Sequence, residues 1–104
     1  MIKVSVFYPN EEGKKFDMNY YIKGHIAMVQ EFCGEAIKGL SVEQGLSRVD
    51  PGTSPIYVAT AHFLFDSVED FMSSWGPHVE TLRADIANYT DIEPIIQIGE
   101  VKMQ

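Results

Sequence analysis

The chain has 104 residues, 45% of them hydrophobic and 22% charged, a composition typical of one soluble globular domain spanning residues 1–104. Its formal net charge of −7 and its isoelectric point near 4.7 argue against nucleic acids and anionic membranes as partners, because both attract clustered Lys and Arg side chains. The single cysteine, Cys33, excludes an intrachain disulfide and is expected to be a buried, inert thiol.

The amino-terminal part predicts a strand followed by a helix. Apolar side chains alternate along residues 2–8, the period of a strand with one buried face. This segment lacks the long apolar run of a signal peptide or a transmembrane helix, so we expect a cytoplasmic protein. Asp17 is placed to cap a helix that continues to about Phe32, and Gly34 is placed to end it.

The rest of the chain predicts two paired strands, an interrupted helix and a last strand. Alternation indicates strands over residues 40–46 and 56–65, separated by a Pro- and Gly-rich turn. Ser67 is expected to cap a helix that Gly76-Pro77 interrupts and that resumes over residues 79–86. The resulting order, β-α-β-β-α-β, predicts an α+β, ferredoxin-like subunit with a four-stranded antiparallel sheet and two helices on one face.

The last strand, residues 92–101, has no consistently polar face. Two helices cover only one side of a small sheet, so we expect the other side to meet a second copy of the sheet. This predicts an obligate homodimer that buries more than about 2,000 Å². An aspartate at Ile96 or Ile98 should prevent formation of the dimer, one acting through the subunit core and the other through the dimer contact.

Tyr20, Tyr21 and His25 on the first helix form the first candidate site. Tyr21 and His25 are four residues apart, so they share a helix face and could direct a phenol and an imidazole at the same small molecule. This pair suits general acid–base chemistry. In an equally favoured alternative, Tyr21 packs in the core and His25 hydrogen-bonds a backbone carbonyl.

His62, Trp75, His78 and Tyr89 are further candidate pocket residues. His62 lies among apolar neighbours in a strand, where its charged form is disfavoured, and it could be a neutral base or donor, although a buried histidine is more often structural. Aromatic side chains with polar tips, such as those near the Gly76-Pro77 break, are common in ligand pockets and also at subunit contacts.

The sequence contains no motif for a metal or a nucleotide cofactor. The three histidines lie far apart in the sequence, and no metal-binding His or Cys spacing is present. The chain also lacks a dinucleotide-binding fingerprint, a phosphate-binding loop and a serine nucleophile elbow. We therefore expect neither a metal nor a cofactor.

Two segments, residues 16–25 (FDMNYYIKGH) and 84–98 (ADIANYTDIEPIIQI), resemble the EthD family, which is named for a protein of ethyl tert-butyl ether degradation. The similarity extends through essentially the whole chain. It implies a ferredoxin-like subunit that pairs sheet to sheet as a dimeric α+β barrel, and it places Tyr21 and His25 at positions that face a pocket. The chain has Ala27, two residues after the histidine, where the family commonly has proline.

The resemblance also implies a function, because members of the family are associated with degradation or modification of small organic molecules and are often labelled oxidoreductases. We expect a dimer that binds a hydrophobic or aromatic molecule between sheet and helices and assists its oxidation, reduction or rearrangement without a cofactor. His25 would donate or accept the proton, Tyr21 would be its hydrogen-bonding companion, and His62 and Trp75 would line the pocket.

The alternative is a non-catalytic small-molecule-binding or stress-response dimer of the same fold, in which the histidines are structural. The interior of the subunit discriminates between the two. An open pocket that holds His25 would favour the enzyme, whereas a closed and well-packed interior would favour the binding module.

Overall fold

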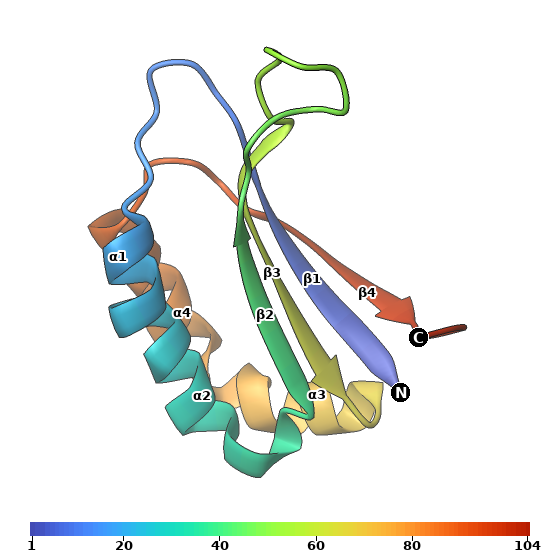
Figure 1. Cartoon of the computed structure of the whole chain (residues 1–104). Coiled ribbons are helices and arrows are strands. Elements are labelled where there is room, and N and C mark those ends of the chain that lie inside the picture. Colours follow the sequence, from blue (N-terminus) through green and yellow to red (C-terminus); the bar gives the residue numbers. More distant parts are fainter.

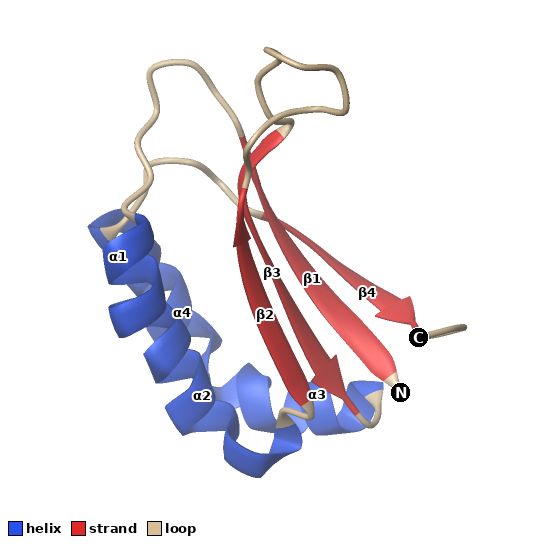
Figure 2. Ribbon diagram, in the orientation of Figure 1, coloured by secondary structure: helices blue, strands red, loops and turns tan.

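Four antiparallel strands form one sheet in the order β2-β3-β1-β4, and the helices all lie on one face of it (Figure 1 and Figure 2). The computed structural model describes all residues, 1–104. The strands are β1 (Ile2–Pro9), β2 (Gly39–Gln44), β3 (Tyr57–Phe65) and β4 (Ile95–Glu100). The helices are α1 (Met18–Tyr20), α2 (Ala27–Cys33), α3 (Val68–Trp75) and α4 (Val79–Asp85). This architecture confirms the predicted ferredoxin-like fold.

The core lies between the two central strands and the helices. Alternate side chains of β1 and β3 point toward the helices, as the period of a strand requires. Each of these central side chains is at most 5% exposed: Val4, Val6 and Tyr8 on β1, and Ala59, Ala61, Phe63 and Phe65 on β3.

The first helical segment is continuous but changes its winding. The Asp17 carboxylate caps it by accepting a hydrogen bond from the backbone N–H of Tyr20 at 3.0 Å. Between α1 and α2, the segment Tyr21–Ile26 is a π-helix, a rare form found disproportionately at functional sites. Gly34, with φ of +51°, ends α2. The predicted cap and end are confirmed, whereas the π-helix leaves no signal in the apolar spacing.

The second helical segment also follows the prediction. The Ser67 hydroxyl caps α3 by accepting a hydrogen bond from the backbone N–H of Asp70 at 3.0 Å. A 3₁₀ turn, Gly76–His78, separates α3 from α4, so the interruption at Gly76-Pro77 is confirmed. No helix is long and apolar enough to span a membrane.

The last strand differs from the prediction in two ways. It begins at Ile95 instead of residue 92, because Pro94 cannot donate a ladder hydrogen bond. Ile96 and Ile98 pair with Val6 and Val4 and therefore point to the same, helix-bearing side. The prediction that these two isoleucines act on opposite faces is wrong.

The face of the sheet opposite the helices, here called the outer face, is not covered by any element of the subunit (Figure 2). Phe7 and Tyr57 pack together on it, with ring centroids 4.9 Å apart. Ile95 pairs with Phe7 and extends this apolar surface to the sheet edge, where its side chain is 54% exposed. The isolated subunit thus leaves apolar side chains on the outer face in contact with water.

Candidate active site

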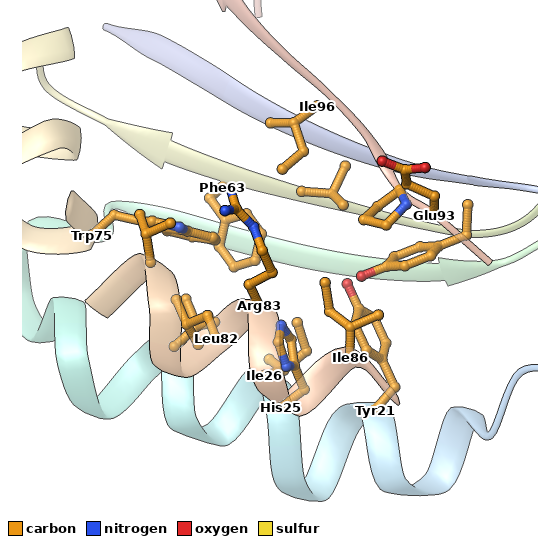
Figure 3. A pocket seen from close by; sticks show the side chains of 15 residues that line it. Tyr21, His25, Ile26, Phe63, Trp75, Leu82, Arg83, Ile86, Glu93 and Ile96 are labelled. Atoms are coloured by element: carbon orange, nitrogen blue, oxygen red, sulfur yellow. The ribbon is translucent and has the colours of Figure 1, made fainter. Parts of the chain in front are cut away.

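A cavity of about 250 Å³ lies between the sheet and the helices (Figure 3). Eleven of the fifteen residues that line it are hydrophobic. The fifteen lining residues include three of the predicted site residues, Tyr21, His25 and Trp75. Arg83 and Glu93 are further polar residues on the wall. An apolar hollow with a few converging polar groups is the usual form of a small-molecule site.

His25 is held at the cavity by a carboxylate from α4. Its Nδ1 atom lies 2.9 Å from Oδ2 of Asp85, and both side chains are 8% exposed. The Tyr20 hydroxyl donates to the other carboxylate oxygen at 2.7 Å, and the Asn88 side-chain amide donates to that same oxygen at 3.0 Å. The Asp85 carboxylate is thereby fixed from three sides, and it in turn fixes the imidazole ring.

The protonation of this pair follows from its surroundings. Burial lowers the pKa of His25, against the opposing effect of the hydrogen bond and charge of Asp85. Burial works against the ionised form of Asp85, but hydrogen bonds from Asn88, Tyr20 and His25 outweigh it, so the pKa of Asp85 is lowered. At neutral pH the carboxylate is therefore ionised and the imidazole neutral. Because an ionised carboxylate only accepts, we assign the imidazole proton to Nδ1.

With the proton on Nδ1, the second ring nitrogen of His25, Nε2, carries a free lone pair. Nε2 has no hydrogen-bond partner in the protein. Every fully buried side-chain nitrogen or oxygen does have a partner, so Nε2 is not fully buried. Nε2 is therefore accessible from the cavity that His25 lines. A neutral imidazole held from behind by a carboxylate, with its free nitrogen in an apolar hollow, has the geometry of a general base.

The π-helix presents Tyr21 and His25 together. Their rings stack with centroids 5.7 Å apart and 15° between the planes. Gly24 in the same turn makes room for Tyr20, because a Cβ atom at Gly24 would lie 3.0 Å from the Tyr20 ring. A larger residue there would push the Tyr20 phenol away from Asp85.

The ring of Tyr89 packs against the imidazole of His25. Its ring centroid is 4.9 Å from that of His25, and its hydroxyl lies 2.7 Å from the hydroxyl of Tyr8. Burial raises the pKa of Tyr8, Tyr21 and Tyr89, so all three phenols are neutral. Tyr21 and Tyr89 pack against the imidazole, and Tyr8 contacts both of them, without adding charge.

Of the five predicted pocket residues only Trp75 lines this cavity; His62, His78, Tyr20 and Tyr89 do not. His62 lies on the outer face of the sheet, where its Nδ1 is 2.8 Å from Oγ of Ser5 and its Nε2 is 3.5 Å from Oε1 of Glu43. His78 stacks on Phe32 with ring centroids 3.9 Å apart. The network that holds His25 comes from both helical segments. Tyr20, Tyr21 and His25 lie on the first, and Asp85 and Tyr89 lie at the end of the second.

Sequence reasoning missed Asp85, although a signal was present. Asp85 falls among Val79, Leu82 and Ile86, the apolar positions of its helix, where a carboxylate is unexpected. A lone acidic residue on an apolar helix face needs a partner, and His25 supplies it. No group of three or more His, Cys, Asp or Glu side chains is arranged to hold a metal ion.

The site should make the stability of the fold depend on pH. Since the folded-state pKa of His25 lies below its ordinary value of about 6.5, the unfolded chain binds more protons in this range. The free energy of unfolding should therefore fall as the pH drops through about 6.5, and fall again in acid as Asp85 is protonated. Urea unfolding at a series of pH values measures this dependence. His25→Gln should lose the first step and His78→Gln should keep it; identical profiles would contradict the assignment.

The fold and the cavity define the class of protein: a ferredoxin-like subunit with a histidine-bearing pocket between its sheet and its helices. Comparison with protein-family models and with curated proteins gives no match. Among solved structures, the chain is similar to an EthD-like protein of Ralstonia eutropha JMP134, with 43% identity over 99% of this chain and 93% of that one and a TM-score of 0.93. The chain belongs to the EthD-like family, which confirms the resemblance found in its sequence.

Two more distant structures share the fold. One is a dimeric protein of unknown function and ferredoxin-like fold from Bacteroides fragilis NCTC 9343, 11% identical over 96% of this chain and 95% of that one, with a TM-score of 0.56. The other, from Nitrosomonas europaea, is provisionally named an antibiotic biosynthesis monooxygenase; it is 14% identical over 99% of this chain and all of that one, with a TM-score of 0.60. Similarity at this identity shows the fold alone.

Proposed function

We propose that this protein binds a small hydrophobic or aromatic molecule in the cavity and that His25 removes a proton from it as a general base. One observation carries the proposal: Nε2 of His25 opens into an apolar cavity while Nδ1 is anchored to Asp85 at 2.9 Å. Anchoring fixes the tautomer and the direction of the lone pair. Asp85 also stabilises the imidazolium that proton transfer creates.

The chemistry is a proton transfer that needs no outside reactant. A C–H or O–H bond of the ligand breaks, the proton passes to Nε2, and the electron pair stays on the ligand as a carbanion or an oxyanion. Return of the proton to a different atom of the same ligand completes a rearrangement. An oxidation or reduction needs a second reactant, such as dioxygen or a partner reductase, so the oxidoreductase assignment stays a prediction.

The volume of the cavity limits the size of the ligand. Pockets for drug-sized ligands commonly measure about 300–1,000 Å³. A cavity of about 250 Å³ suits a molecule of one or two rings. Aromatic rings on the wall, Tyr21 and Trp75 among them, favour a flat apolar ligand.

A non-catalytic binding module is the second candidate function. The observation that favours it is the saturated network around Asp85, whose three donors would also stabilise a purely structural histidine. The two candidates predict the same ligand binding and differ in whether a proton is exchanged.

We also propose that the subunit forms a homodimer through its outer face. The face carries Phe7, Tyr57 and Ile95 with no helix above them. A protein of the same fold from Bacteroides fragilis is described as dimeric. Pairing of two sheets would remove this apolar surface from water on both copies.

Ligand binding is tested with Trp75, the single tryptophan of the chain, which lines the cavity. Titration with one-ring and two-ring phenols and ketones should change its fluorescence and saturate. Val79→Phe should fill part of the cavity and weaken binding about tenfold or more, by analogy with the cost of overpacking. Val68→Phe is the matched control, because Val68 opens α3 as Val79 opens α4 and does not line the cavity. Absence of saturation by every compound, or equal binding by Val79→Phe and the parent, would contradict the proposed pocket.

A further inference from the structure

We infer that Arg83 binds the anion formed when His25 removes a proton, and that the ligand is therefore a weak acid, either a phenol or an enolisable carbonyl compound. This inference rests on the proposed function and adds to it the chemical class of the ligand. It also assigns to Arg83 a role in binding the reacting group.

Arg83 enters the cavity wall from α4, two residues before Asp85. In Figure 3 its side chain extends from the helix toward the sheet. It forms no ion pair and no hydrogen bond with another side chain, although most other polar side chains at the site are paired. Arg83 is exposed to solvent and also lines the cavity, so its guanidinium is hydrated in the free protein and can exchange that water for a ligand.

Proton transfer to His25 leaves a negative charge on the ligand, which the cation of Arg83 can stabilise. When Nε2 of His25 takes the proton, a negative charge appears on a molecule surrounded mainly by hydrocarbon. An unpaired charge in such surroundings is strongly disfavoured. The planar guanidinium of Arg83 offers several N–H donors to an oxyanion and stays charged at every physiological pH. It is the one permanent cation on the cavity wall.

The other charged groups around the cavity, Asp85 and Glu93, favour a ligand that is neutral when it enters. Asp85 is behind His25 and satisfied by three donors, so it balances the imidazolium. Glu93 lies on the wall near Pro94, on the strand side, and has no ion-pair partner (Figure 3). Its carboxylate opposes an anionic ligand. A ligand that enters neutral and becomes charged only within reach of Arg83 fits this distribution better than one that is already an anion.

The experiment uses two nitroaromatic probes of similar shape, 4-nitrophenol and 4-nitrotoluene. Binding of either should quench Trp75, while the visible absorption of the phenolate reports directly how much of the bound nitrophenol is ionised. In the parent protein the apparent pKa of bound nitrophenol should be lower than in free solution. Arg83→Gln should weaken binding of the phenolate roughly tenfold, because one charge-assisted contact at a partly solvated site is lost.

Matched variants separate the possible results. Nitrotoluene should bind Arg83→Gln and the parent alike, Arg83→Lys should restore part of the phenolate affinity, and Glu93→Gln should increase it. Arg48→Gln, which removes the only other arginine, should change nothing. If both probes bind the parent and Arg83→Gln leaves phenolate affinity and ionisation unchanged, the role of Arg83 is refuted while the pocket stands. If neither probe binds the parent, the proposed function itself fails.

Discussion

Replacing His25 by glutamine should reduce the base-catalysed reaction of this protein by about 10² to 10⁴, the usual contribution of a general acid–base group. Glutamine can still donate a hydrogen bond to Asp85, so the network behind the ring is largely kept. What is lost is the free lone pair of Nε2 that opens into the cavity. The loss should therefore appear in turnover far more than in folding.

The effect can be measured before the natural ligand is known. Exchange of the acidic C–H protons of phenylacetone with D₂O, followed by NMR, needs only a base in a pocket that accepts one ring. The parent should accelerate exchange above the buffer rate, and the rate should decline below the pH at which His25 becomes protonated.

His78→Gln is the matched control, because His78 stacks on Phe32 and does not line the cavity. It should exchange at the parent rate. A His25→Gln protein that exchanges as fast as the parent would show that His25 is not the base. One that loses about 1–3 kcal/mol of stability but binds ligands normally would indicate a structural histidine.

Replacing Ile95 by aspartate should convert the dimer to a monomer. Ile95 lies on the outer face beside Phe7, and a two-fold contact would contain the new charge twice. Burying an unpaired carboxylate costs on the order of several kcal/mol. Light scattering at low micromolar concentration should then give 11.7 kDa for the variant and twice that mass for the parent.

The neighbouring residue provides a close control. Ile96 is 54% exposed, as Ile95 is, but it points to the helix-bearing side and lines the cavity. Ile96→Asp should remain dimeric and bind apolar ligands more weakly. A parent that is monomeric in solution, or an Ile95→Asp protein that stays dimeric, would contradict pairing through the outer face.

Much of the fold could be predicted because its signals are local. Asp17 and Ser67 cap helices through hydrogen bonds to residues three positions ahead, and Gly34 ends one through its own backbone angle. The alternation in β1 and β3 similarly needs only neighbouring residues to be read. Element order and class followed from these signals and from the EthD-like segments.

The site was only partly predictable. Tyr21 and His25 are four positions apart, so helical spacing was enough to place them together, and both line the cavity. The partner of His25 is 60 positions away at Asp85, and nothing local links the two. His62 was a further, weaker candidate by composition, and strand alternation with helices on a single face places it on the other side of the sheet.

By itself, then, the sequence determined the elements, their order, the caps and the helix that carries the candidate base, because each depends on residues within about one or two turns. Only the tertiary structure decided which histidine faces a cavity, that Asp85 holds it, and that Arg83 lies unpaired on the wall. It also decided that Ile96 and Ile98 share a face. These features depend on which face of the sheet the helices cover and on how distant segments pack, and no local pattern encodes either of them.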